Sequence, residues 1–422
     1  MFYKVEKILL NPTYKILVEN FVSLSFLQIA NYIFPLVTLP YLVRVLGPEK
    51  YGLIAFAQAF IGYFQILTDY GFNLSATREI SINRENKEKI SEIFSSVMII
   101  KFFLLLVSFV LMSATIFSFG KFRQNWLIYY LTFGMVLGQT LFPIWFFQGM
   151  EKMKYITFLN ILSKFIFTVA TFAFIRRASD FLYVPLLNSS GFIISGIISI
   201  WLIVTNFCVK MRVPRLEVIL KYFKDSTQFF LSRVSISVYT FTNTFVLGLF
   251  KSTQEVGYYS VAEKLYIALQ QIYQPMGNTL YPYVAHKKNI WLYRRIFKVV
   301  FFFNFIIALV LFVLAKQIIN IIFGTNLDIS ASIFRILLLS YIVVVPSILL
   351  GYPLLAAMGF PIYANISVVA GSFLHLVGLV ILFYLNLINV YSISTMVLVT
   401  ESFVLMIRVY GVIKGNLWKY NQ

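Results

Sequence analysis

Long apolar runs alternate with short polar stretches along the whole chain. A helix of about 20 apolar residues spans a hydrocarbon core of roughly 30 Å, and twelve runs reach that length. They cover residues 21–43, 52–73, 93–119, 126–148, 155–175, 182–207, 229–250, 256–283, 298–323, 332–356, 362–385 and 391–413. The longest gap between them, 208–228, is too short for a folded soluble domain. The pattern predicts an all-α polytopic membrane protein with twelve transmembrane helices.

The composition agrees with this class and excludes others. Of 422 residues, 60% are hydrophobic and 12% charged, whereas soluble domains average about a quarter charged. The single cysteine, Cys208, excludes a disulfide scaffold, and two histidines at distant positions give no metal-site spacing. No metal or cofactor is therefore expected. The net charge of +19 comes from loops between the runs, so it does not indicate a nucleic-acid partner.

Lysine and arginine are shared unequally between the two sides of the membrane. If the N-terminus is cytoplasmic, the inner segments hold 21 of these residues and the outer loops hold 7. Cytoplasmic loops carry such an excess, so both termini are predicted to be cytoplasmic. The first run has no cleavage-site pattern and is expected to be a retained helix.

Two motifs of the first half recur in the second. Gly52 in "YGLIAFAQ" corresponds to Gly257 in "VGYYSVAEK", and Pro143 in "PIWFFQG" to Pro353 in "PLLAAMG". Chance recurrence of Gly, Pro and Tyr is one interpretation; duplication of six helices is the other. Six is even, so the copies would share one orientation and be related by a pseudo-two-fold axis along the membrane normal. The predicted parts are a six-helix bundle (1–207), a basic cytoplasmic linker (208–228) and a second six-helix bundle with a short tail (229–422).

Four segments carry a resemblance to a known family. They are "LPYLVRVLGPEKYGLIAFAQ" (39–58), "DYGFNLSATREIS" (69–81), "PIWFFQGMEKMKYIT" (143–157) and "VGYYSVAEKL" (256–265). These segments and the helix number resemble Wzx-type flippases, the O-antigen and capsular polysaccharide transporters of the multidrug/oligosaccharidyl-lipid/polysaccharide exporter superfamily. The resemblance implies that an undecaprenyl-diphosphate-linked oligosaccharide moves by alternating access from the inner to the outer leaflet of the bacterial cytoplasmic membrane. It also makes the polysaccharide polymerase and the chain-length regulator candidate partners.

Such a cargo requires cations inside the membrane, because its diphosphate is costly to move through hydrocarbon. Charged residues within spans are expensive and usually face a cavity. Lys164 lies nine residues into its run, about 13 Å deep at 1.5 Å per residue, and Lys101 is almost as deep. We predict that the cavity is lined by Lys101, Lys164, Arg233 and Lys264. Snorkelling or internal pairing with Asp69 or Glu401 is the alternative for the first two, and snorkelling to the headgroups is the alternative for Arg233.

The cations nearer the helix ends are interpreted differently. Arg44 and Arg78 flank the first two runs and either contact the substrate at the cavity mouths or meet lipid phosphates; the resemblance favours substrate binding. Snorkelling, in which a long side chain reaches the headgroups, is expected for the three others. These are Lys316, Arg335 and Arg408.

Three acids lie within the predicted spans: Asp69, Glu263 and Glu401. A buried carboxylate becomes protonated or holds a cation, so these residues are the predicted ion-coupling groups. A static pair with Lys or Arg from another helix is the alternative. His375 lies in mid-helix, and a lone histidine there is more often a hydrogen-bonded packing residue than a proton carrier.

Two other functions compete with the flippase. A cation-coupled multidrug antiporter of the same superfamily would carry small amphipathic substrates, but seven intramembrane cations against three acids favour an anionic cargo. A membrane glycosyltransferase or polymerase would need catalytic groups on large exterior loops, and the predicted exterior loops have only five to eight residues. No catalytic arrangement stands out, so the chain is not expected to be an enzyme.

Overall fold

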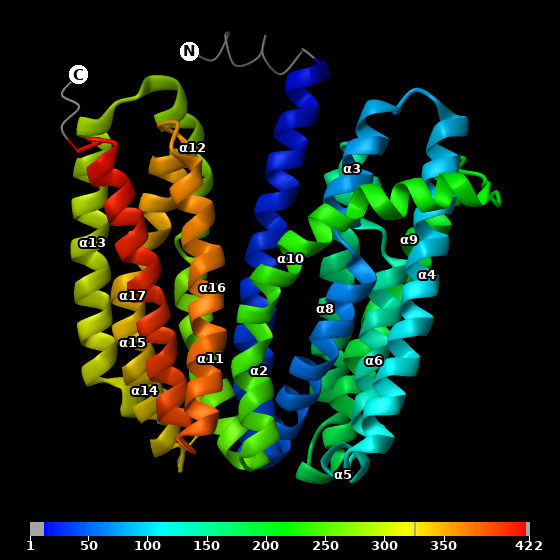
Figure 1. Cartoon of the computed structure of the whole chain (residues 1–422). Helices are drawn as coiled ribbons and strands as arrows, with labels where there is room; N and C mark the ends of the chain where they lie inside the picture. Colours follow the sequence, from blue (N-terminus) through cyan, green and yellow to red (C-terminus); the bar gives the residue numbers. More distant parts are fainter. Residues whose placement is uncertain (1–11, 325, 419–422) are drawn as a thin grey trace. The chain divides into compact units, whose positions relative to one another are not determined.

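The computed structural model describes residues 12–324 and 326–418, and every regular element within them is a helix (Figure 1). The chain ends, on which the predicted orientation of the termini depends, lie outside these residues. The all-α class predicted from the apolar runs is confirmed.

Nine helices in the described part are long and apolar enough to cross a membrane. One of the nine takes in the first two predicted runs, because α2 (Pro12–Asp69) continues through both and leaves helical geometry only at Gly47, with φ of 73°. Within the described part of α10 (Leu216–Phe250), the stretch Phe241–Phe250 is apolar but shorter than a membrane span. The count of twelve spans therefore stays a prediction.

The chain divides into two compact units. The first comprises the described residues up to Gly47 together with Ala57–Ser237. Its further helices are α3 (Phe72–Ile82), α4 (Lys87–Ser118), α5 (Gly120–Arg123), α6 (Trp126–Leu141), α7 (Ile144–Gly149), α8 (Met153–Phe174), the 3-10 helix η1 (Ala178–Leu182), α9 (Tyr183–Asn206) and the start of α10. Both α6 and α8 pack against α9. Gly138 of α6 lies directly against Phe192 of α9, a small-residue contact that lets transmembrane helices approach closely.

The helix of the second predicted run ends before that run does. Tyr70 and Gly71 have φ of 45° and 76°, so α2 stops at Asp69 and the chain starts again as α3. This short helix occupies a segment predicted as loop. The left-handed backbone at Gly71 suits glycine, and a Cβ there would also lie 2.7 Å from Phe229 of α10.

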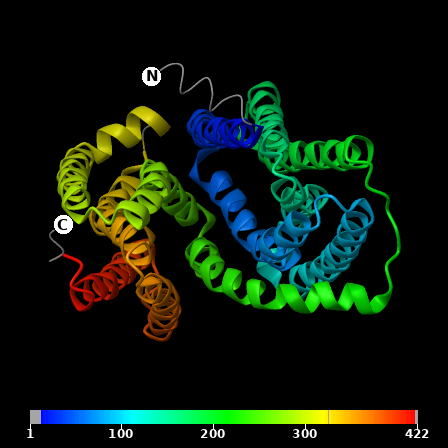
Figure 2. The same ribbon diagram turned by 90° about the horizontal axis from the view of Figure 1, so that it is seen from above.

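The start of α10 belongs to the first unit and runs obliquely across α3 and α4 (Figures 1 and 2). The rings of Phe223 and Phe230 stack on Tyr70 at centroid distances of 4.5 and 4.6 Å. The hydroxyl oxygens of Ser226 and Ser75 are 2.7 Å apart. The segment predicted as a linker, 208–228, is therefore helical from Leu216 onward, and the units divide after Ser237. Stacked rings and a buried hydroxyl pair hold this stretch on the first unit.

The second unit comprises Pro48–Phe56 and the described residues from Val238 onward. After the end of α10, its helices are α11 (Thr253–Gln271), α12 (Gln274–Lys287), α13 (Ile290–Val313), α14 (Ala315–Phe323), α15 (Asp328–Leu349), the π-helix η2 (Leu350–Ala356), α16 (Pro361–Tyr384) and α17 (Val390–Lys414). The central element is α15, which packs against α11, α13 and α17, while α16 packs against α17.

The two "YG" and "VG" motifs contact each other within the second unit. A Cβ at Gly52 would lie 1.8 Å from the carbonyl oxygen of Thr253, and one at Gly257 would lie 1.9 Å from that of Pro48. Both pairs, 52 with 257 and 48 with 253, are separated by the same offset of 205. Such reciprocity is what two copies related by a two-fold axis make, so the contact supports the predicted duplication.

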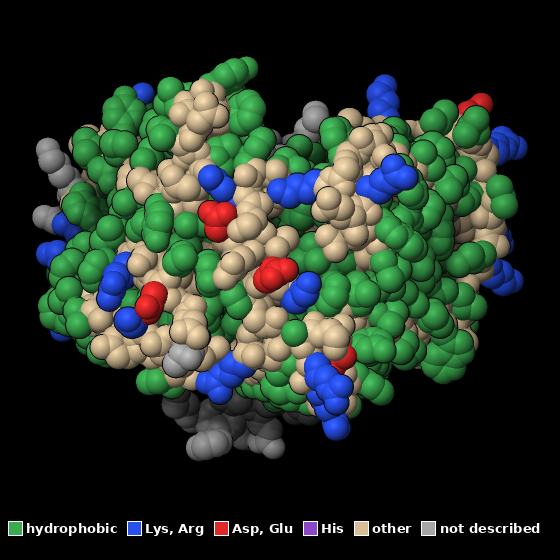
Figure 3. All heavy atoms as spheres, turned by 90° about the horizontal axis from the view of Figure 1, so that it is seen from below, with side chains coloured by type: hydrophobic (Ala, Val, Ile, Leu, Met, Phe, Trp, Pro, Cys, Tyr) green, Lys and Arg blue, Asp and Glu red, His purple; other side chains and the backbone are tan. Residues whose placement is uncertain are grey.

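The outer surface carries many large apolar side chains. Phe102, Phe103 and Leu106 of α4 and Phe302 and Phe303 of α13 are exposed. Viewed from below, hydrophobic side chains cover most of the periphery, and charged ones are scattered over the helix ends (Figure 3). Soluble proteins rarely expose apolar patches of this extent, so the chain is a multi-pass membrane protein.

Candidate functional site

Lys164 lies on α8 in the first unit and is half-buried. Its ammonium group donates a hydrogen bond to the amide oxygen of Asn31 on α2. About two turns earlier on α8, Thr157 donates to the carbonyl oxygen of Ser23, 2.9 Å away. The amide contact differs from the alternative of a pair with Asp69 or Glu401. A neutral acceptor holds the ammonium in place without cancelling its charge.

Lys101 of α4 is buried, with 4% of its surface exposed. Asp69, at the end of α2, is close enough for its charge to act on this lysine. The carboxylate of Asp69 also accepts a hydrogen bond of 2.6 Å from the side chain of Asn73 on α3. The first unit therefore brings one predicted substrate cation and one predicted ion-coupling acid near each other, as the pairing alternative proposed.

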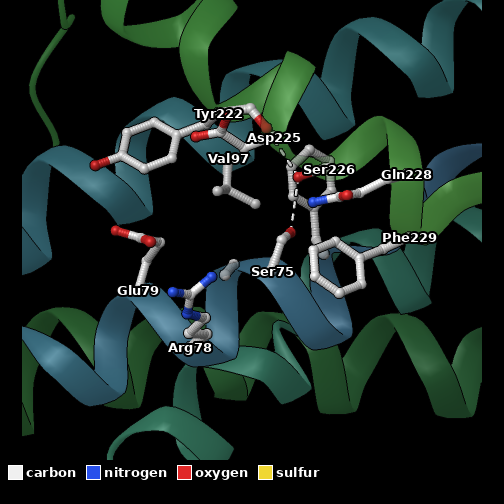
Figure 4. A pocket seen from close by; sticks show the side chains of 11 residues that line it. Ser75, Arg78, Glu79, Val97, Tyr222, Asp225, Ser226, Gln228 and Phe229 are labelled. Carbon is white, nitrogen blue, oxygen red and sulfur yellow. Dashed lines mark hydrogen bonds between the residues drawn. The ribbon is translucent and has the colours of Figure 1, made fainter.

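A cavity of about 220 Å³ lies between α3, α4 and the start of α10. Arg78 and Glu79 project from α3 toward Tyr222 and Asp225 of α10 (Figure 4). Burial raises the pKa of the Tyr222 phenol, which keeps it a neutral hydrogen-bond donor. One cation faces two acids here, so the lining does not select an anion, and the proposed substrate contact of Arg78 gains no support from this cavity.

The other predicted substrate-binding cations are more exposed or are not described. Arg44 is exposed on α2, three residues before Gly47. Lys264 is exposed on α11, and its charge acts on the neighbouring Glu263. The side chain of Arg233 lies outside the described part of the structure. The grouping of four cations around one anion therefore stays a prediction.

The two predicted ion-coupling acids of the second unit, Glu263 and Glu401, are half-buried. Glu263 of α11 accepts a hydrogen bond of 3.1 Å from the hydroxyl of Thr244 on α10. Glu401 lies on α17, directly after the buried Thr400. Among the described residues, no group of three or more His, Cys, Asp and Glu side chains is placed to hold a metal ion.

The expectation that Arg408 snorkels is wrong. Only 8% of this residue is exposed. Its guanidinium donates to the carbonyl oxygen of Ser347 at 2.7 Å and to the hydroxyl of Ser367 at 2.9 Å. The chain leaves helical geometry at Gly351 within η2, next to the guanidinium. Arg408 therefore joins α15, α16 and α17 from inside the unit.

Of the other two cations near helix ends, Lys316 is exposed and Arg335 is half-buried. Lys316 lies 3.0 Å from the carboxylate of Asp328. Arg335 donates to the carbonyl oxygen of Phe312 at 3.1 Å.

Sequence reasoning missed the neutral partners of these charges. Asn31 and Asn243 are amides within apolar runs, and both accept or approach a nitrogen of a titratable side chain. Polar residues within transmembrane helices commonly hydrogen-bond across helices. An amide inside an apolar run was therefore the available signal, although its partner could not be read from spacing.

Relatives with curated descriptions match about two thirds of the chain. A protein from Escherichia coli K12 described as "Putative O-antigen transporter" is 29% identical over 267 residues, which are 63% of this chain and 64% of the relative. A protein from Shigella dysenteriae with the same description is 30% identical over 266 residues, 63% of this chain and 66% of the relative. The matched part thus spans just under two thirds of each relative.

Solved structures share the fold. An inward-facing multidrug resistance transporter of the MATE family superposes with a TM-score of 0.68 at 14% identity, covering 96% of this chain and all of the other. The lipid II flippase MurJ in an inward closed conformation gives the same TM-score and identity, covering 94% and 89%. Identities this low establish the fold alone.

A family model covers more than half of the sequence. The family described as polysaccharide biosynthesis protein matches residues 17–288. This range includes α2 from residue 17 onward and every helix from α3 to α12. All four segments quoted above for their resemblance lie within that range. The chain therefore belongs to the polysaccharide biosynthesis protein family.

Proposed function

We propose that this protein is a flippase for lipid-linked oligosaccharides. Its cargo would be an undecaprenyl-diphosphate-linked repeat unit of O-antigen or capsule, moved from the cytoplasmic to the outer leaflet by alternating access. The observation that carries the proposal is the pair of lysines within apolar helices of the first unit, Lys101 and Lys164, in a chain of this family. A buried ammonium is costly, and an anionic headgroup would offset that cost.

In this proposal the cations contact the substrate at different places. Lys101 and Lys164 would contact the diphosphate, joined by Arg233 and Lys264 as the two bundles rock. Lysine acts on phosphate as a point charge, whereas arginine can bind it with two hydrogen bonds. A moderate cluster of cations suits a site that must also release its cargo. Arg44 and Arg78 would act at the two mouths.

The proposal also implies a location for the protein and the proteins that act beside it. The protein would lie in the bacterial cytoplasmic membrane with both termini inside, as the excess of inner Lys and Arg indicates. The relatives described as O-antigen transporters support a role in polysaccharide export rather than catalysis. The polysaccharide polymerase and chain-length regulator would be neighbouring proteins in this process.

A multidrug antiporter is the second candidate, because the fold is also that of a MATE transporter. Such a protein would take cationic drugs, and acids rather than lysines would then line its cavity. Lys101, which is buried on α4, argues against an antiporter, because its charge would repel a cationic substrate.

The test is the location of lipid-linked repeat units in cells lacking this gene. We expect the units to accumulate on the inner leaflet, where an added sugar-oxidising enzyme cannot reach them in spheroplasts. Restoring the wild-type gene should make them reachable. Normal surface polysaccharide together with increased retention of a cationic dye in the deletion strain would instead identify the antiporter.

A further inference from the structure

Large apolar side chains are exposed where the chain passes from α9 to α10 in the first unit. Val213 is 91% exposed and Leu216 is 69% exposed, and more than half of Met211 and of Leu220 is exposed as well. All four lie outside the stretches that are long and apolar enough to cross a membrane. Contact with the lipid around a spanning helix therefore does not explain their exposure.

Cations outnumber acids among these apolar side chains. The cations are Lys210, Arg212, Arg215, Lys221 and Lys224, all of them exposed, and the acids are Glu217 and Asp225. The orientation of a membrane protein explains an excess of cations on one side, but it requires no apolar side chains between them. Basic and apolar side chains together are typical of a segment that lies in the membrane interface.

This segment is held against the first unit along one side. The backbone amides of Lys210 and Arg212 donate to the hydroxyls of Ser91 and Ser95 on α4, at 3.1 and 3.0 Å. On the helix that follows, Tyr222 is buried against the same unit. The start of α10 crosses α4 instead of running beside it (Figures 1 and 2). Because α4 is a candidate membrane span, a helix that crosses it in this way runs along the membrane surface.

The exposed residues at the start of α10 separate into two opposite flanks. Leu216 and Leu220 are four residues apart, which places them about 40° apart around a helix of 3.6 residues per turn. Asp225 follows Leu216 by nine residues, which places it about 180° away, and it lines the polar cavity beside α3 (Figure 4). One flank is therefore apolar and the other is polar. Lys224 follows Leu220 by four residues, so it lies beside the apolar flank.

We propose that residues 210–224 form an interfacial anchor that binds anionic lipid headgroups. Leu216 and Leu220 enter the boundary between headgroups and acyl chains, and Lys224 and the other cations contact lipid phosphates. The flank that carries Asp225 faces water. The ligand is a lipid of the surrounding membrane, so the anchor does not depend on the identity of the transported cargo.

Two contributions favour an anionic leaflet. Burial of the exposed apolar side chains in the interface is favourable in proportion to the area removed from water. Each cation beside an anionic surface strengthens binding about fivefold, the equivalent of about 1 kcal/mol. A zwitterionic lipid offers the apolar contact but has no net charge to attract the excess cations. The anchor should therefore select anionic lipid over zwitterionic lipid, and a lipid held there restrains the end of a helix that continues into the second unit after Ser237.

Spin labels test which flank meets lipid. The only cysteine of the chain is removed by Cys208→Ser, and Leu220→Cys or Asp225→Cys then carries a nitroxide in the full chain, in nanodiscs that contain phosphatidylglycerol. We expect the label at 220 to collide mainly with oxygen, which concentrates in lipid, and the label at 225 to collide mainly with a water-soluble nickel chelate. Both positions are exposed, so neither label displaces the core. A label at 220 that meets water as readily as the label at 225 would overturn the proposal.

A lipid titration tests the role of charge. Phosphatidylglycerol is added to the Leu220→Cys protein in detergent, and the midpoint of the change in label mobility is measured. Lys224→Gln should raise this midpoint about fivefold. Lys287→Gln, which removes an equally exposed cation at the end of α12 in the second unit, is the matched control and should leave it unchanged.

Three results of this titration would contradict an anionic-lipid anchor. They are an equal midpoint with phosphatidylcholine, the same change on adding inorganic phosphate alone, and an equal shift in the Lys224→Gln and Lys287→Gln proteins. The first would leave only apolar contact, the second would replace the lipid by a free anion, and the third would reduce the effect to net charge.

Discussion

The two compact units hold their buried polar side chains in different ways. In the first unit, Lys164 has a neutral amide as its partner and Lys101 has one acid nearby. In the second unit, His375 and Arg408 are each hydrogen-bonded to two other helices. A buried polar side chain that is tied into several helices holds structure. A lysine held by an amide keeps its charge available for an anion.

Arg408 and Lys101 give the strongest test of this contrast. Arg408→Met leaves the acceptors of Ser347 and Ser367 without a donor, and we expect a loss of about 3 kcal/mol of stability, in the range for breaking buried charged networks. Lys101→Met removes a buried charge, but Asp69 keeps its hydrogen bond from Asn73, so the loss of stability should be smaller than that of Arg408→Met. Thermal unfolding in detergent measures both. Equal losses would mean that the two units do not differ in this respect.

Lys164 tests the availability of charge in the first unit. Lys164→Met keeps the stem but removes the ammonium, and we expect transport to fall by at least about tenfold, the equivalent of 1.4 kcal/mol. Lys164→Arg keeps the charge and should retain part of the activity. Surface polysaccharide in a complemented deletion strain is the measurement. Lys316→Ala, an exposed residue paired with Asp328, is the control and should have little effect.

If Lys164→Met supports normal surface polysaccharide, this residue does not hold the diphosphate. The substrate contact would then move to the rim residues Arg44 and Arg78.

Asn31 allows the neutral partner of Lys164 to be exchanged for an acid. Asn31→Asp would pair the ammonium with a carboxylate, and we expect transport to fall severalfold because the positive charge is then compensated. Asn31→Gln preserves a neutral acceptor and is the matched control. Surface polysaccharide again reports the result. Full activity of the Asp variant would show that an uncompensated charge is not required.

The smallest effect is expected at the surface of the first unit. Arg84 and Glu151 form an ion pair of 2.7 Å whose side chains are 31% and 47% exposed. Glu151→Gln should cost less than about 1 kcal/mol, because exposed pairs contribute little. The loss should shrink further at high salt. A cost as large as that of Arg408→Met would show that burial does not set the scale of these effects.

The sequence by itself determined the fold class and the family. The apolar runs are long and frequent enough that only membrane-spanning helices can accommodate them, and local motifs around Gly52 and Pro143 carried the resemblance. The depth of Lys101 and Lys164 in their helices also followed from spacing. These features depend on nearby residues, and hydropathy, helix rise and motif order report them directly.

Only the tertiary structure decided which polar groups meet. The break at Tyr70 and Gly71, the continuation of α10 from the predicted linker and the burial of Arg408 all depend on packing with distant segments. The same holds for His375, whose partners Asn243 and Thr400 are 132 and 25 residues away. A hydropathy profile averages over a window of residues and does not report which way a side chain points. Whether a polar side chain meets lipid or a hydrogen-bond partner depends on which helices pack against its face.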